Sequence, residues 1–184
     1  GGMQQASLFA VDAATGTEVW RYDGQVEGHR FTDPVVANGR VYVSEGDMLL
    51  ARGGRFVVLD AASGEEIWTV DLDLSAPPAV HGDTLYVQAR TRGSIPGTVR
   101  ALDAATGEEY WRVSAWDVSL EAPAVTDGLV LVPSGTREGY APGYDDVLLT
   151  AYAAETGDVL WQIGLDGSIS GSPAILDGQI YVTT

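Results

Sequence analysis

One phrase, repeated four times, constrains the fold of this chain more than any other feature. Its copies read AVDAATGTEVW, VLDAASGEEIW, ALDAATGEEYW and AYAAETGDVLW, and they end at Trp20, Trp68, Trp111 and Trp161. Successive tryptophans lie 48, 43 and 50 residues apart, a period that is typical of repeat architectures. In such proteins the repeated residues hold neighbouring units together, so function is expected in the residues that differ between copies.

The segments between these phrases predict an all-β fold. Short runs of Val, Ile, Leu and Tyr alternate with breaks rich in Gly, Pro, Asp and Ser, and amphipathic helical stretches are absent. With 45% apolar residues among 184, the chain is able to bury a core. No apolar run approaches the ~20 residues that span a membrane, so membrane insertion is not expected.

Each repeat predicts four strands. One apolar strand precedes the turn of the repeated phrase, and a second strand carries the tryptophan. The third strand begins after a proline, and a tight turn leads to the fourth, which reads VYV, LYV, VLV or IYV. The prolines are Pro34, Pro78, Pro123 and Pro173, and the turns begin at Asn38, Gly82, Asp127 and Asp177. Asn-Gly and Asp-Gly between apolar runs predict type I′ hairpin turns, in which both central residues have positive φ.

The repeated phrase predicts a turn followed by a packing contact. Its aspartates are expected to accept hydrogen bonds from backbone N–H groups two or three residues further on. Its glycines are expected to adopt backbone conformations closed to other residues. Each tryptophan is expected to dock between neighbouring units, because such a ring buries roughly 150–250 Å². The turn residues concerned are Asp12, Asp60, Asp103, Gly16, Gly64, Gly107 and Gly157.

Charge and residue usage exclude several classes of function. The net charge is −16, from 26 acidic and 10 basic residues, and every basic residue is Arg. Such a surface repels nucleic acid and anionic membranes. The sequence has no Cys, which excludes disulfides and thiolate sites. The two histidines, His29 and His81, have no local Ser or Cys motif that predicts a hydrolytic triad. A small basic patch at Arg90, Arg92 and Arg100 is interpreted as an ion-pairing surface.

At the repeated phrase the sequence resembles the pyrroloquinoline quinone (PQQ) β-propeller repeats, whose tryptophan-docking pattern is A-x-D-x-x-T-G-x-x-x-W. The departures from that pattern are Val58, Ser63 and Ala153. The resemblance implies a β-propeller built of four-stranded antiparallel blades. It also implies that the repeated turn joins strand C to outermost strand D, and that the Pro-led piece is innermost strand A. The family includes quinoprotein dehydrogenases, the BamB outer-membrane assembly scaffold and sensor domains of receptor kinases.

With these strand assignments the chain begins at strand C and ends at strand B. We expect residues 1–5 to be a tag remnant and leader, and residues 6–184 to form one repeat domain. The repeats lie at about 6–55, 56–98, 99–147 and 148–184, which predicts three full blades and two half-blades. Three arrangements are open: part of a larger propeller, a homodimer that closes an eight-bladed ring, or a four-bladed ring. The first two are favoured, because natural proteins avoid the exposed sheet edges that half-blades leave.

Antiparallel strands sort the connections onto two faces. The short A–B and C–D turns are expected on one face, and the variable B–C and D–A connections, such as residues 88–98, on the other, where binding is usual. Trp116 is a candidate anchor for a ligand, although covering a blade edge is its more common role. Adjacent carboxylates are able to bind Ca²⁺, but without spaced Asp ligands a solvated polar loop is favoured. The candidate binding residues are Trp116, Arg137, Tyr140, Tyr144, Asp145 and Asp146.

These patterns favour a non-catalytic scaffold or sensor that binds a protein, peptide or envelope ligand through the variable loops. The alternative is a fragment of a PQQ-dependent quinoprotein dehydrogenase that oxidises an alcohol or sugar. For such enzymes the resemblance implies PQQ over a Trp, Ca²⁺ held by Glu, Asn and Asp, and often a disulfide. The chain has no Cys, and its single Asn, Asn38, lies in a short turn, so no catalytic, cofactor-binding or metal residue is assigned. The resemblance alone favours the cell envelope or the extracellular side.

Overall fold

All regular structure in the described part of the chain is β-strand. The computed structural model describes residues 6–26, 28–46, 54–91, 94–115, 121–134, 147–167 and 169–184. These ranges contain eighteen strands in five antiparallel sheets. Within them, no helix has the length and apolar character of a membrane span. The predicted all-β class is confirmed.

The sheets follow one another in chain order. The first contains β1 (Ser7–Val11) and β2 (Glu18–Asp23). The second contains β3 (Arg30–Phe31), β4 (Val35–Ala37), β5 (Arg40–Gly46), β6 (Arg55–Asp60) and β7 (Glu66–Val70). The third contains β8 (Asp73–Leu74), β9 (Ala79–His81), β10 (Thr84–Thr91), β11 (Ser94–Asp103) and β12 (Glu109–Ala115). The fourth contains β13 (Ala124–Thr126), β14 (Leu129–Ser134), β15 (Val147–Ala153) and β16 (Val159–Leu165). The fifth contains β17 (Ala174–Leu176) and β18 (Gln179–Tyr181).

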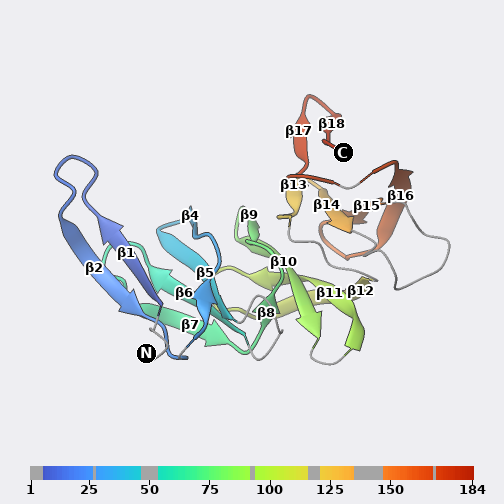
Figure 1. Ribbon diagram of the computed structural model, residues 1–184. Coiled ribbons are helices and arrows are strands. Elements are labelled where there is room, and N and C mark those ends of the chain that lie inside the picture. The colour runs from blue at the N-terminus through green and yellow to red at the C-terminus, as the bar shows by residue number, and fades with distance from the viewer. Residues whose placement is uncertain are drawn as a thin grey trace.

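The chain is out of phase with its sheets, as the sequence predicts. The three middle sheets each pair strands in the order A, B, C, D, whereas the first has only C and D and the last only A and B. Figure 1 shows the N-terminal hairpin β1–β2 and the C-terminal hairpin β17–β18 at opposite ends of the row. The first and last sheets of the described chain therefore contain two strands each.

The apolar cores lie between neighbouring sheets. Val41 and Val43 of β5 pack with Trp20 of the first sheet, whereas Tyr42 of the same strand packs with Leu85 of the third. Successive residues of a strand point to opposite faces, and both faces of the middle sheets are covered. This explains why runs such as VYV are continuously apolar instead of alternating with polar residues.

Two predicted boundaries were wrong. Strand A is interrupted at the proline. The short strands β3 and β8, which precede Pro34 and Pro78, also pair with strand B, although these stretches were expected to belong to the D–A connections. Proline has no N–H to donate to the ladder, so the pairing is interrupted at the proline and is present on both sides of it. Just before Pro34, the amide of Thr32 donates to the carbonyl of Ser44 at 2.8 Å. The connection expected over residues 88–98 is mostly hairpin, because β10 runs to Thr91 and β11 starts at Ser94.

The A–B turns are of two kinds. Asn38 and Asp177 have φ of 51° and are each followed by a glycine with positive φ, which is the pattern of a type I′ turn. At the other two turns only Gly82 and Gly128 have positive φ. The type I′ prediction is therefore confirmed for the first and last of these turns, and it is wrong for Asp127.

Candidate functional site

The short turns of each middle sheet meet at one end of it. The amide of Ala61, in a C–D turn, donates to the carbonyl of Gly39, in an A–B turn, at 3.0 Å. The same bond joins Ala104 to Asp83 at 2.9 Å and Ala154 to Gly128 at 3.1 Å. We call this end the turn face, and we call the opposite end of each sheet, where the strands lead toward the B–C and D–A connections, the loop face. The predicted grouping of the A–B and C–D turns on one face is confirmed.

The aspartate of the repeated phrase organises its own turn. The Asp60 Oδ1 accepts hydrogen bonds from the amides of Ala62 and Ser63 at 3.0 and 2.8 Å, and from the Ser63 hydroxyl at 3.0 Å. The same three bonds surround Asp12 and Asp103. The predicted bonds to residues two and three further on are confirmed.

These bonds favour the charged carboxylate. Asp103 also accepts a hydrogen bond from the Tyr110 hydroxyl at 2.7 Å. That bond first, and then those from Thr106, lower the pKa of Asp103 from 3.8 to about 2. Bonds from the hydroxyl and amide of Thr15 likewise lower the pKa of Asp12. The turns are thus held by charge-assisted bonds at neutral pH.

Three tryptophans reach the turn of the next sheet. Their indole N–H groups donate to the carbonyls of Ala61, Ala104 and Ala154, at 3.0 Å from Trp20, 3.3 Å from Trp68 and 2.8 Å from Trp111. A Cβ added to the glycine of the receiving turn would lie 2.6 Å from Trp20 at Gly64, 2.9 Å from Trp68 at Gly107 and 2.7 Å from Trp111 at Gly157. The ring therefore fills the space over each glycine, which supports the predicted docking role.

The remaining tryptophan and glycine of this set lie at the two ends of the row. Trp161 of β16 packs among the apolar residues that include Ile175 and Ile180 of the last hairpin. Gly16 lies in the β1–β2 turn with φ of +70°, and within the described part of the chain no atom beyond its two chain neighbours lies within 4 Å of a Cβ position. Among the described residues, neither Trp161 nor Gly16 takes part in a Trp–Gly contact.

The predicted binding residues lie outside the described ranges, so their role stays a prediction. They are Trp116, Arg137, Tyr140, Tyr144, Asp145 and Asp146. Arg92 of the basic patch is also outside. Arg100 forms an ion pair with Glu109 at 3.1 Å, which agrees with the ion-pairing interpretation of that patch.

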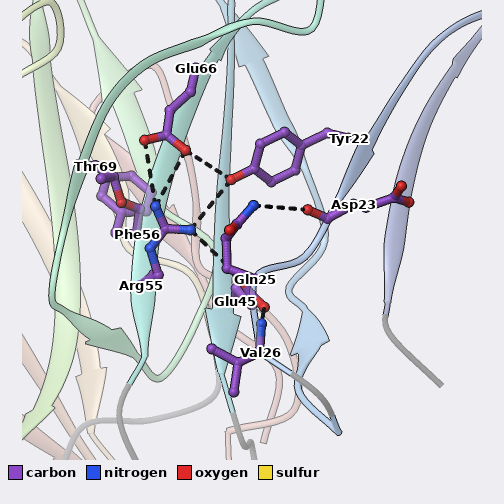
Figure 2. A network of polar contacts seen from close by, with 9 residues as sticks. All are labelled: Tyr22, Asp23, Gln25, Val26, Glu45, Arg55, Phe56, Glu66 and Thr69. Atoms are coloured by element: carbon purple, nitrogen blue, oxygen red, sulfur yellow. Dashed lines mark hydrogen bonds and ion pairs between the residues drawn. The ribbon is translucent and has the colours of Figure 1, made fainter. Parts of the chain in front are cut away.

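A polar network, not foreseen from the sequence, runs along the joint between the first and second sheets (Figure 2). The Tyr22 hydroxyl of β2 donates to the Glu66 carboxylate of β7 at 2.9 Å. Arg55 of β6 lies 3.3 Å from the same carboxylate oxygen and donates to the Tyr22 hydroxyl at 3.4 Å. Burial and the bond to Glu66 raise the pKa of Tyr22, so its hydroxyl remains a donor. The network links two blades through three side chains.

Glu45 anchors the start of a loop-face connection. This carboxylate is fully buried, and its Oε1 accepts a hydrogen bond from the Val26 amide at 2.7 Å. Its Oε2 lies 3.8 Å from Arg55 Nη1. A Cβ at Gly24 would lie 2.8 Å from Oε1, so a residue without a side chain makes room for the carboxylate. The sequence feature that could have indicated this site is the pair of opposite charges, Glu45 and Arg55, on either side of one predicted connection. In the structure these two residues pair across the β5–β6 hairpin.

Two side chains link neighbouring sheets at the turn face. Asn38 donates through Nδ2 to the carbonyl of Gly82 at 2.7 Å, which joins the second sheet to the third. His81 Nε2 lies 2.7 Å from Asp127 Oδ1, which joins the third sheet to the fourth. The single Asn of the chain and one of its two histidines are therefore engaged in blade–blade contacts.

Comparisons with known proteins agree with this fold. A quinohemoprotein alcohol dehydrogenase of Comamonas testosteroni is 31% identical over 164 residues, which are 84% of this chain but only 16% of that protein. The crystal structure of the dehydrogenase from the same organism matches with a TM-score of 0.68 at 18% identity, over 96% of this chain and 36% of the solved one. The crystal structure of BamB from Moraxella catarrhalis matches with a TM-score of 0.60 at 22% identity, over 91% of this chain and 47% of the other.

This chain thus spans less than half the length of each of these proteins, and the two structural likenesses show the β-propeller fold alone. The match to a family model covers nearly all of this chain. The sequence model described as outer membrane protein assembly factor BamB matches residues 2–53, 52–146 and 140–184. Because these matches cover nearly the whole chain, the protein belongs to the family of outer membrane protein assembly factor BamB.

Proposed function

We propose that this chain is a non-catalytic propeller scaffold that binds a protein or peptide through its loop face. The observation that carries the proposal is the anchoring of residues 24–26 by the buried Glu45 carboxylate. A variable connection is thereby fixed at its base on a packed sheet. Rigid frames that hold variable loops are the usual setting for binding surfaces.

The blade joints support the same proposal. Trp–Gly contacts, the Tyr22–Glu66 bond and the Asn38 and His81 links connect successive sheets. Such joints keep the spacing between loops of different blades constant. A pre-organised surface loses less conformational entropy when a partner binds, so a scaffold gains affinity from this construction.

The family description suggests the partner's chemistry. The family takes its name from an outer membrane protein assembly factor. We therefore propose an unfolded segment of an outer-membrane polypeptide as the ligand and the cell envelope as the location. The probe is a fluorescently labelled outer-membrane β-barrel polypeptide, unfolded in urea and diluted into the chain. Fluorescence anisotropy should give a saturable binding curve.

The proposed position of the site is tested by variants of the predicted binding residues and of one residue near the turn face. Trp116→Ala and the double variant Tyr140→Ala, Tyr144→Ala should each weaken binding at least tenfold. Val36→Ser is the control, because Val36 is 65% exposed on β4, next to an A–B turn. Loop variants that bind as tightly as the parent chain would overturn the loop-face proposal.

A second candidate is a fragment of a PQQ-dependent dehydrogenase, which the 31% identity to the Comamonas enzyme favours. Among the described residues, no three His, Cys, Asp or Glu side chains lie together as a metal site, and Asn38 is bound at the turn face. These residues do not fit Ca²⁺-bound PQQ, and no catalytic step is assigned to them. Titration with PQQ and Ca²⁺ tests this candidate: saturable absorbance changes with dye-linked alcohol oxidation would replace the scaffold proposal.

A further inference from the structure

Gln88 of β10 carries a fully buried amide side chain. Glutamine is mostly found at protein surfaces, and a buried amide group is normally paired. Here the Nε2 atom of Gln88 donates to the main-chain carbonyl of Glu121 at 2.7 Å. β10 belongs to the third sheet, whereas Glu121 lies two residues before Pro123, where the chain enters the fourth sheet. The amide therefore ties one sheet to the connection that leads into the next.

Gln88 lies on the face of β10 that packs against the fourth sheet. Tyr86, two residues earlier in the same strand, points to the same face and packs with Val130 and Tyr152 of that sheet. The Tyr86 hydroxyl donates to the carbonyl of Ala154, in a C–D turn, at 3.3 Å. Tyr86 thus contacts the fourth sheet at the turn face, and Gln88 contacts it toward the loop face.

The counterparts of Gln88 in the other middle sheets are Ser44 and Pro133, as the pairing of strands B and C shows. In the second sheet, the amide of Ser44 donates to the hydroxyl of Thr32 at 3.0 Å, so the incoming connection is held from within the sheet. Pro133 has no N–H and is unable to make the equivalent bond. Gln88 supplies a donor to the incoming connection of the fourth sheet from the neighbouring sheet instead.

The same residue also holds a second D–A connection. The amide and the hydroxyl of Ser75 donate to the main-chain carbonyl of Gln88 at 3.0 and 3.3 Å. Ser75 is buried and lies in the connection from the second sheet to the third. A buried amide that loses its acceptor costs more than an ordinary hydrogen bond contributes, so the Glu121 carbonyl is held where Nε2 reaches it. Gln88 therefore fixes the spacing between the connections on the two sides of the third sheet.

We propose that Gln88 is a positioning residue of the loop face. It does not touch the partner; it fixes the end of the third-to-fourth connection, at Glu121 and Ala122, relative to Ser75. This inference rests on the proposed scaffold function. A surface whose parts are already held in place loses less conformational entropy when a partner binds. Removal of the Gln88 donor should therefore weaken binding by a chain that is still folded.

Gln88→Met tests this role, because methionine is close to glutamine in length and has no donor. Gln162→Met is the matched control: Gln162 Nε2 donates to the Thr150 hydroxyl at 2.7 Å within the fourth sheet. The probe is the labelled outer-membrane β-barrel polypeptide, unfolded in urea. Its binding should weaken about fivefold in Gln88→Met, the effect of one lost hydrogen bond, and less than about twofold in Gln162→Met. Equal affinities of the two variants would overturn the proposal.

Urea denaturation of both variants separates positioning from stability, since affinities are then compared where each variant is fully folded. NMR supplies a second readout that needs no ligand. The Glu121 carbonyl and the Ala122 amide belong to one peptide group, so the loss of the bond from Gln88 should shift both signals. Nitrogen relaxation should show faster motion of the Ala122 amide in Gln88→Met, and not in Gln162→Met.

The two readouts distinguish the failure of this inference from the failure of the scaffold function. If the parent chain does not bind the polypeptide, the scaffold function is wrong, and the NMR comparison alone decides the role of Gln88. An Ala122 amide that is as rigid in Gln88→Met as in the parent chain would overturn the positioning role, whatever the affinity of the parent chain.

Discussion

Trp111 of β12 lies directly over Gly157, which belongs to the turn after β15 in the next sheet. A Cβ on that glycine would lie only 2.7 Å from the indole ring, and the indole N–H donates to the neighbouring Ala154 carbonyl at 2.8 Å. The absence of a side chain at Gly157 is therefore required twice: by its φ of +76° and by the ring above it. The two requirements can be separated by experiment.

Gly157→Ala should destabilise the fold more than Gly128→Ala. Gly128 has a similar φ of +81°, but no atom of the described residues, apart from its two chain neighbours, lies within 4 Å of its Cβ position. Left-handed backbone costs a residue with a side chain about 1–2 kcal/mol, and this cost applies to both variants. Overpacking against Trp111 should add about 1–3 kcal/mol for Gly157→Ala alone. Urea denaturation followed by tryptophan fluorescence measures the difference, and equal losses would contradict the packing argument.

Trp68→Ala should lower the free energy of unfolding by about 3 kcal/mol, at the lower end of the range for truncating a core aromatic side chain, because Trp68 is partly buried. Trp68 packs against the core between the second and third sheets and meets Phe56 edge-on, with ring centroids 5.5 Å apart. Ile67→Ala is the control, because the neighbouring Ile67 is exposed and should cost less than about 1 kcal/mol. Calorimetry of both variants checks the prediction, which similar melting temperatures would disprove.

The chain should lose stability in acid through its turn aspartates. The pKa of Asp103 is lowered in the folded state from 3.8 to about 2, so its contribution is present above pH 3.8 and is lost as the pH falls through about 2. Tyr110→Phe removes the bond that lowers this pKa most. The pKa of Asp103 should therefore rise, and the acid unfolding midpoint should move to higher pH.

NMR titration of the carboxyl carbons measures the pKa of Asp103 directly. Tyr181→Phe is the matched control, because the Tyr181 hydroxyl donates to Gln179 and not to a carboxylate. If the pKa of Asp103 were the same in Tyr110→Phe and in the parent chain, the assignment of this cause would be wrong.

Arg55→Met should destabilise the fold by about 3 kcal/mol, at the lower end of the range for removing one member of a buried ion pair. The variant removes the guanidinium that lies 3.8 Å from the buried Glu45 carboxylate, together with a contact to Tyr22. Arg21→Met is the control, because the pair between Arg21 and Glu18 is about half exposed and should contribute less than about 1 kcal/mol. Chemical denaturation of both variants gives the comparison; a loss no larger for Arg55→Met than for Arg21→Met would contradict it.

Contacts between residues close in the sequence were predictable, whereas contacts between residues far apart in the sequence were not. The bonds of Asp60 to Ala62 and Ser63 involve residues at most three apart, so the spacing of the phrase predicted them. The Glu45 anchor was missed because its partner Val26 is 19 residues away, and the Tyr22–Glu66 bond because it joins residues 44 apart. The extent of the β10–β11 hairpin was missed for a related reason: residues 88–98 were expected to be a variable connection, whereas pairing between the two strands continues through most of it.

By itself, the sequence determined the turns, the order of the strands and the phase in which the chain is divided into blades. These follow from short-range backbone requirements and from strand-length apolar runs, which each segment carries within itself. Only the tertiary structure decided which glycines Trp20, Trp68 and Trp111 cover and how Glu45 is buried. Those features depend on how twisted sheets stack on one another, which brings together residues from different repeats.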